Sequence, residues 1–132
     1  RNGAAMDSWK AMIRAQGGDP DAKLPVAKEQ TVITAQSTGE LIAMDAMKVG
    51  VSAWRLGAGR SRQGESVQAG AGIEIHAKPG EQVVAGQPLF TLHTDESARF
   101  ERAIEALNGA VKISQSGEKV ERLPLIIERI EG

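Results

Sequence analysis

The spacing of apolar positions divides the chain into short elements that glycine and proline separate. Within residues 4–16, large apolar side chains recur at steps of three and four, which is typical of one face of a helix. They are Met6, Trp9 and Ile13, with Met12 beside them. Two glycines at 17–18 follow, where helices commonly end in a left-handed residue. The polar stretch 19–28, which contains two prolines, then predicts a connector.

Two runs rich in β-branched and apolar residues come next, at 31–36 and 41–44. The turn sequence Ser-Thr-Gly-Glu separates them. Because two such runs around a short turn are the usual signature of a β-hairpin, we expect residues 31–44 to form one.

Residues 45–56 fit either a strand or a helix by spacing alone. Asp45 is a favourable N-cap, and Gly57 occupies the position just beyond the end, so we predict a helix. In this helix we expect Met47 to contact the core and Lys48 to lie in the first turn, facing solvent.

The second half of the chain alternates apolar and polar residues between turn signals. The alternation predicts three strands, at 73–78, 82–84 and 88–94. A second helix is expected over 96–107 with Asp95 as its cap, and two final strands over 110–116 and 123–130.

This order of elements predicts an α+β fold with a mostly antiparallel sheet and flanking helices. The chain has no initial methionine and opens close to a helical pattern, so we expect it to be a piece of a longer protein. Residues 1–28 would then be a helix and connector that lead from an upstream region. Residues 29–132 would form the α+β domain.

Composition limits the classes of protein open to the chain. Its 132 residues, 41% apolar and 25% charged, suffice for one domain with a real core. The 16 basic and 17 acidic residues nearly cancel, so no nucleic-acid partner is expected. Cysteine is absent, which excludes disulfides and thiolate metal sites and suits a cytoplasmic location. No apolar run approaches the roughly 20 residues of a membrane helix, and no signal peptide is visible.

The first candidate for chemistry is Lys48. The sequence around it, Met-Asp-Ala-Met-Lys, resembles the Glu-Ala-Met-Lys-Met motif of biotin-carrier domains, in which the lysine carries the prosthetic group. Such domains place a G-x-x-V-x-x-G-x-x-L segment on each side of the lysine. Here there is one copy, at 80–89, and it lies well after the lysine. An unmodified surface lysine is therefore the favoured interpretation, and a biotinyl- or lipoyl-like carrier or adaptor module stays as the alternative.

The second candidate is the glycine-rich segment 57–66, which holds Gly57, Gly59, Arg60, Arg62 and Gly64. Glycines let a backbone approach an anion closely, and guanidinium groups offer charge-assisted hydrogen bonds. The spacing matches neither the dinucleotide fingerprint nor a P-loop. From spacing alone, a flexible surface connection with two solvated arginines is the simpler interpretation.

The other polar residues indicate no self-contained active site. His76 and His93 each lie on a predicted strand without a cysteine as a third ligand. Glu118 and Glu121 are typical of solvated charge, and no serine carries a nucleophile-elbow motif. We predict no catalytic, cofactor-binding or metal-binding residue in this chain, and no cofactor.

Several segments taken together resemble the C-terminal region of pyrimidine-nucleoside phosphorylases, with the thymidine phosphorylases as the nearest subtype. They cover almost the whole chain in the family's order: AQGGDP (15–20), STGELIAMDAMKVG (37–50), LGAGRSRQGESV (56–67), AGIEIHAKPGEQVVAGQPLFTLHTD (71–95) and the helix ERAIEAL. Glu65 stands where the family often has aspartate, which is a mild departure.

The resemblance implies a parent enzyme that is a homodimer. It would cleave pyrimidine nucleosides with phosphate, in nucleotide salvage, to give free base and (deoxy)ribose 1-phosphate. The C-terminal region would belong to the phosphate-holding α/β side and have a hammerhead-like β motif related to the barrel–sandwich hybrids of carrier domains. Segment 80–89 would then share the β architecture of carrier domains, without a prosthetic group.

The family's base- and phosphate-binding residues lie upstream of this region, so the resemblance carries no catalytic residue onto the chain. It implies that the isolated chain is inactive and that its partner is the remainder of the same polypeptide. The counterpart of segment 57–66 is a mobile loop able to approach the cleft. Arg60 and Arg62 are therefore the residues to test first.

Overall fold

The computed structural model describes residues 2–60, 62–114, 126 and 128–130. The elements follow in this order: α1 (Ala4–Ala15), β1 (Glu29–Thr34), β2 (Gly39–Met44), α2 (Ala46–Ala53), the π-helical turn η1 (Trp54–Ala58), β3 (Gly72–Ile75), β4 (Gln82–Val83), β5 (Pro88–Thr94), the 3₁₀ turn η2 (Ser97–Arg99), α3 (Phe100–Ala106) and β6 (Val111–Ser114). Most of the elements expected from the sequence are present, within a few residues of the predicted bounds.

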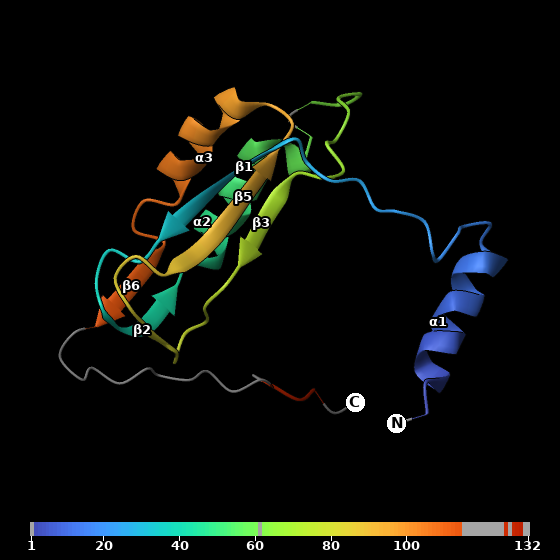
Figure 1. The fold of residues 1–132 in the computed structure, drawn as a ribbon, viewed down its shortest axis with the longest axis horizontal. Coiled ribbons are helices and arrows are strands. Elements are labelled where there is room, and N and C mark those ends of the chain that lie inside the picture. The colour runs from blue at the N-terminus through green and yellow to red at the C-terminus, as the bar shows by residue number, and fades with distance from the viewer. Residues whose placement is uncertain (1, 61, 115–125, 127, 131–132) are drawn as a thin grey trace.

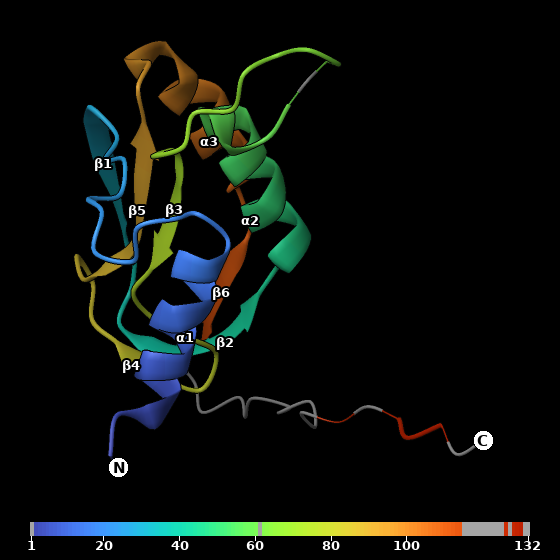
Figure 2. The same ribbon diagram turned by 90° about the vertical axis from the view of Figure 1, so that its right-hand side faces the viewer.

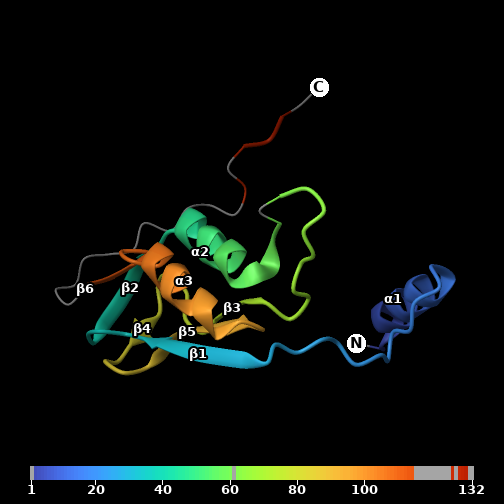
Figure 3. The same cartoon turned by 90° about the horizontal axis from the view of Figure 1, so that it is seen from above.

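The described strands form two three-stranded antiparallel sheets, both open (Figure 1). In one sheet β5 lies between β1 and β3, and in the other β2 lies between β4 and β6. Helices α2 and α3 lie side by side over the strands (Figures 2 and 3). The predicted α+β class with antiparallel pairing is confirmed.

The core lies between the strands and this pair of helices. Its largest fully buried apolar side chains are Leu41, Leu56, Val83, Phe90 and Leu92. Burying a side chain of this size contributes about 1.5–3 kcal/mol. The two helices are also joined by a buried hydrogen bond, because the Ser52 hydroxyl donates to the carbonyl oxygen of Ala103 at 2.8 Å.

The predicted hairpin over 31–44 is wrong, although both of its strands exist. β1 pairs with β5, and β2 pairs with β4 and β6, so the two neighbours in sequence belong to different sheets. The link between them is held by Ala35, whose N–H donates to the carbonyl of Gln87 and whose carbonyl accepts from Gly86. Long-range pairing prevails because it covers both edges of β5, which holds much of the buried apolar surface.

The helix predicted over 45–56 is confirmed, with a different end. The Asp45 carboxylate accepts from the backbone N–H of Lys48 at 3.1 Å, which is an N-cap. After Ala53 the chain continues as the π-helical turn η1. The expected core contact of Met47 is wrong, because its side chain is 75% exposed. The side of α2 that carries the buried Ser52 faces α3 instead.

The cap predicted for the second helix is also wrong. That helix begins with η2 after Glu96, without a side-chain cap. The Asp95 carboxylate instead accepts from the backbone N–H of Lys28 at 3.1 Å and so fixes the connector to the end of β5. Of the last predicted strand, 123–130, residues 123–125 and 127 lie outside the described residues, and the described residues 126 and 128–130 do not form a strand.

Helix α1 stands apart from the rest of the described chain (Figures 1 and 3). It buries no residue, and the stripe predicted from spacing is exposed at Met6, Trp9 and Met12. Lys10 reaches Asp21 of the connector at 2.8 Å. The hydrogen bond from Lys10 holds the pKa of the Asp21 carboxyl below its ordinary value. α1 and the first part of the connector therefore fold against each other locally.

Two glycine substitutions test this packing. A Cβ at Gly39 would overlap the backbone carbonyl of Ser114 on β6, so Gly39→Ala should lower the free energy of unfolding by about 1–3 kcal/mol.

Nothing lies within 4 Å of a Cβ at Gly50 in α2, so Gly50→Ala should raise the free energy of unfolding by roughly 0.5–1 kcal/mol. Urea unfolding measures both, and a Gly39→Ala variant as stable as the wild type would contradict the pairing of β2 with β6.

Candidate functional site

The glycine-rich segment 57–66 is a surface loop that begins within η1. Gly57 has φ +109°, a conformation that L side chains rarely adopt, and a Cβ there would lie 2.8 Å from the side chain of Gln68. The indole N–H of Trp54 donates to the carbonyl oxygen of Arg60 at 3.1 Å. A Cβ at Gly59 would lie 2.8 Å from the same indole. These glycines let the loop fold back closely on the residues that hold it.

The two ends of the loop are joined at its base. The backbone N–H of Gln68 donates to the carbonyl oxygen of Gly57 at 3.0 Å. The Gln68 side-chain oxygen accepts from the N–H of Asp95 at 2.8 Å, and its amide donates to Glu96 at 2.6 Å. The loop therefore has the closed ends of an Ω-loop and is fixed to the segment that links β5 to α3.

Thr94 completes this base from the end of β5. Its side chain is fully buried, and its hydroxyl lies 2.8 Å from the carbonyl oxygen of Leu56 and 3.1 Å from the side-chain oxygen of Gln68. A hydroxyl has one hydrogen to donate, and the Leu56 contact is the shorter. The central strand of the first sheet thus positions the start of the loop directly.

The two arginines singled out from the sequence are placed differently. Both are exposed, and Arg62 lines a pocket of about 500 Å³. The backbone N–H of Arg62 donates to the Glu65 carboxylate at 3.2 Å. The other lining residues are Trp54, Arg55, Glu96, Ala98, Arg99 and Arg102. The structure therefore adds three arginines that the loop sequence does not contain.

Lys48 lies in the first turn of α2, as predicted, but it does not extend freely into solvent. It is half-buried, and its ammonium group donates to the carbonyl oxygen of Asn108 at 2.8 Å. A lysine that stabilises the carbonyl groups at the end of α3 is an ordinary structural contact. The hairpin tip that a carrier lysine needs is absent at this position, because Lys48 is helical.

The histidines lie on the first sheet and its border. His76 Nε2 lies 2.7 Å from the Thr91 hydroxyl, and His93 Nε2 lies 3.8 Å from the Glu74 carboxylate. Among the described residues no group of three His, Cys, Asp or Glu side chains converges in a way that would hold a metal ion. Glu118 and Glu121 lie outside the described residues. No described helix is long and apolar enough to cross a membrane.

Comparison with known proteins identifies the family. Residues 41–114 match the family described as the pyrimidine nucleoside phosphorylase C-terminal domain. That match covers more than half of the chain and includes both sheets apart from β1, both helices of the body and the loop. The chain belongs to the pyrimidine nucleoside phosphorylase C-terminal domain family.

Individual relatives extend the match to nearly the full chain. The chain is 48% identical over 130 residues to the thymidine phosphorylase of Mycobacterium tuberculosis (strain ATCC 25618 / H37Rv), covering 98% of this chain and 30% of that protein. It is 30% identical over 135 residues to the pyrimidine-nucleoside phosphorylase of Staphylococcus epidermidis (strain ATCC 12228 / FDA PCI 1200), with the same coverage of each. It is 34% identical over 125 residues to the AMP phosphorylase of Thermococcus kodakarensis, covering 92% of this chain and 24% of that protein.

These findings confirm the resemblance seen in the sequence motifs. The chain spans about 30% of the length of the thymidine phosphorylase and of the pyrimidine-nucleoside phosphorylase named above. Neither the comparisons nor the position of Lys48 supports the carrier alternative.

The base of the loop yields a direct stability test. Thr94→Val keeps the shape of the side chain but leaves the buried Leu56 carbonyl without its donor, so it should lower the free energy of unfolding by about 1–3 kcal/mol. Thr34→Val makes the same change at an exposed position of β1 and should stay within about 0.5 kcal/mol of the wild type. Urea unfolding compares the two. Equal effects of both substitutions would contradict the role assigned to Thr94.

Proposed function

We propose that this chain is the C-terminal, non-catalytic portion of a pyrimidine-nucleoside phosphorylase. Thymidine is the first substrate to test with the parent enzyme. The parent enzyme would convert a pyrimidine nucleoside and phosphate into free base and (deoxy)ribose 1-phosphate. The observation that carries the proposal is the 48% identity to a thymidine phosphorylase over 98% of the chain.

The reaction makes modest demands on this portion. Phosphate attacks the anomeric carbon of the sugar while the base leaves with growing negative charge. The enzyme accelerates this step by positioning the reactants and by stabilising the developing charge with cationic or hydrogen-bonding groups. A rigid body that completes the α/β side and supports closure would contribute to the positioning of the reactants.

We assign loop 57–66 of this body to the substrate-binding cleft of the parent enzyme. Its ends are fixed at Gln68 and Thr94, while Arg60 and Arg62 are exposed. On closure, one or both guanidinium groups would approach the phosphate or the sugar phosphate. Gly57, Gly59 and Gly64 would allow the loop to take up that position.

The N-terminal segment has a separate role in the proposal. Residues 1–28 are the helix and connector that lead from the upstream region, and residues 29–132 are the C-terminal domain. The exposed stripe of α1, which includes Met6 and Trp9, would pack against the remainder of the polypeptide. The parent would be a cytoplasmic homodimer that serves nucleotide salvage.

A chimera tests the proposal. The matched 130-residue segment of the Mycobacterium tuberculosis thymidine phosphorylase is replaced by this chain, and release of thymine from thymidine and phosphate is measured. We expect the chimera to turn over and the 132-residue chain alone to release no base from thymidine or uridine. Turnover by the chain alone, or a folded chimera without activity, would reject the proposal.

Substitutions within the chimera test the loop. Replacing Arg60 and Arg62 together by alanine should lower kcat/KM by about tenfold, the worth of one lost charge-assisted hydrogen bond. Lys78→Ala removes an exposed cation outside the loop and should leave kcat/KM unchanged within about twofold. Equal values for the wild-type and double-alanine chimeras would show that the loop does not contact substrate.

A further inference from the structure

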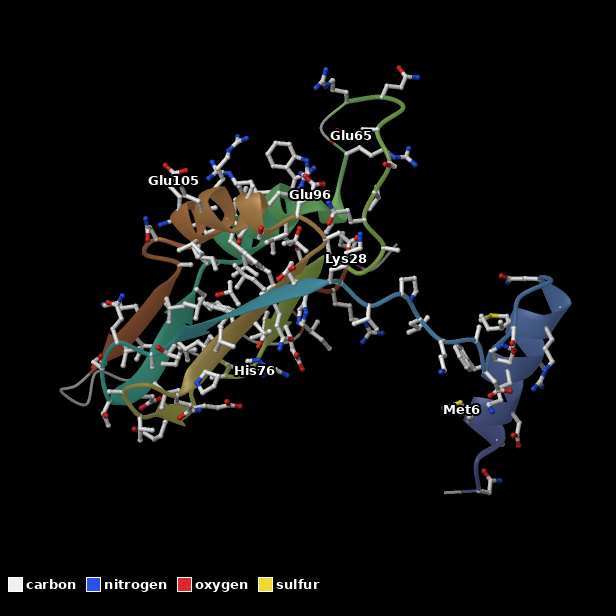
Figure 4. The ribbon with its side chains drawn as sticks, turned by 45° about the horizontal axis from the view of Figure 1, so that its top comes forward. Met6, Lys28, Glu65, His76, Glu96 and Glu105 are labelled. Atoms are coloured by element: carbon white, nitrogen blue, oxygen red, sulfur yellow. The ribbon has the colours of Figure 1, made fainter. Side chains whose placement is uncertain are left out.

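The pocket at the base of the loop gathers four arginines from three separate segments. Arg55 comes from η1, Arg62 from the loop, and Arg99 and Arg102 from η2 and α3. Its remaining lining residues are Trp54, Glu96 and Ala98. We call this the arginine pocket. Figure 4 shows the acidic residues Glu65, Glu96 and Glu105 on the same side of the molecule, on the loop, before η2 and on α3 respectively.

Carboxylates neutralise only part of this positive charge. Arg55 Nη1 lies 2.9 Å from the Glu105 carboxylate and also donates to the carbonyl oxygen of Arg102 at 2.6 Å. Arg99 Nη2 lies 3.1 Å from Glu96. Neither of these ion pairs involves the side chain of Arg62 or of Arg102.

Two guanidinium groups therefore remain available. The side chains of Arg62 and Arg102 are exposed and make no hydrogen bond or ion pair with the described part of the chain. Both line the same pocket, although they come from the loop and from α3. Two like charges brought together repel each other, and a bound anion would relieve that repulsion.

Two further donors lack an acceptor within the part of the chain that the structure describes. The Nε atoms of Arg55 and Arg99 are buried and have no hydrogen-bond partner among the described residues. Buried donors are normally satisfied, so each unpaired donor calls for an explanation. Both belong to residues that line the arginine pocket, where an acceptor brought by a ligand would be close.

The backbone that carries Arg55 is itself unusual. η1 follows α2 but is not a regular helix, because Gly57 within it has φ +109° and ψ 6°, so the chain bends there. It places Trp54 and Arg55 at the pocket while Leu56 enters the core. The Trp54 indole also holds the loop through Arg60, so the wall of the pocket and the loop that carries Arg62 are physically linked.

We propose that the arginine pocket binds the phosphate group of a small ligand, either inorganic phosphate or a phosphate monoester. A tetrahedral dianion has acceptor oxygens in several directions, which suits planar guanidinium forks that approach from different segments. A single carboxylate has fewer oxygens and one charge, so it would use fewer of the four arginines. This site lies within the present chain and does not rest on the proposed activity of the parent enzyme.

Intrinsic fluorescence provides the test, since the chain has two tryptophans and one of them lines the pocket. In a Trp9→Phe background, inorganic phosphate is titrated into the 132-residue chain while the emission of Trp54 is recorded. We expect a saturable change with a dissociation constant in the millimolar range or tighter, which weakens as sodium chloride is added. The absence of a saturable change would overturn the proposal.

Matched variants locate the binding. Arg62→Ala and Arg102→Ala remove guanidinium groups that have no partner among the described residues, and each should weaken phosphate binding by about tenfold. Arg14→Ala removes an arginine from α1 and should leave the affinity within about twofold of the wild type. Circular dichroism checks that each variant is folded. Equal weakening by Arg14→Ala would show nonspecific attraction and overturn the site.

Two further probes identify the source of the phosphate group. Ribose 1-phosphate and inorganic phosphate are titrated against the same protein, with acetate as a singly charged control. Tighter binding of the ester assigns the pocket to a sugar phosphate, and equal or tighter binding of the free ion assigns it to inorganic phosphate. Acetate that binds as well as either one would overturn the phosphate assignment. Arg102 lies on α3, outside loop 57–66. The Arg102→Ala variant therefore tests phosphate binding in the arginine pocket without altering the loop that the proposed function assigns to catalysis.

Discussion

The pairing of β5 on both of its edges is the constraint on which the rest of this structure depends. β1 covers one edge and β3 the other, and the buried side chains of Phe90 and Leu92 come from this strand. At its end, Thr94 is fully buried and holds the carbonyl oxygen of Leu56. The same strand therefore fixes the first sheet, the end of the helical segment and the start of the glycine-rich loop. Because these contacts join distant parts of the chain, we expect the body that β5 holds together to unfold as one cooperative unit.

The functional features lie where this rigid body meets solvent. Gln68 joins the two ends of the loop and connects them to the segment after β5. The arginine pocket lies beside that junction, between η1, the loop and α3. Both features carry charged residues supported by buried contacts, which is the usual arrangement of a binding loop on a stable scaffold. Membership of the phosphorylase family assigns this scaffold to a larger protein, of which the matched relatives are about three times as long.

Local signals in the sequence predicted local features of the structure. The capping role of Asp45, the end of α1 near two glycines, and the strand at 88–94 all follow from neighbouring residues. The predicted hairpin failed because the partners of β1 and β2 lie some 40 to 70 positions further along the chain, where turn chemistry carries no information. Met47 was misplaced because the face of α2 that becomes buried is set by α3. For the same reason the sequence indicated Arg60 and Arg62 but not Arg55, Arg99 and Arg102, which only tertiary packing brings to the loop.

Amide hydrogen exchange of the 132-residue chain tests most directly the central claim that β5 fixes one cooperative body with the loop anchored to it. Amides that open only on global unfolding exchange slowest, and amides without internal hydrogen bonds exchange near their intrinsic rates. We predict the slowest exchange in the peptide that covers Pro88–Thr94 and rapid exchange at the loop amides of Gln63, Gly64 and Ser66, which donate no hydrogen bond within the described residues. The amide of Gln68, which donates to Gly57, should be protected relative to the loop. Exchange of the β5 peptide as fast as that of the loop would contradict the account.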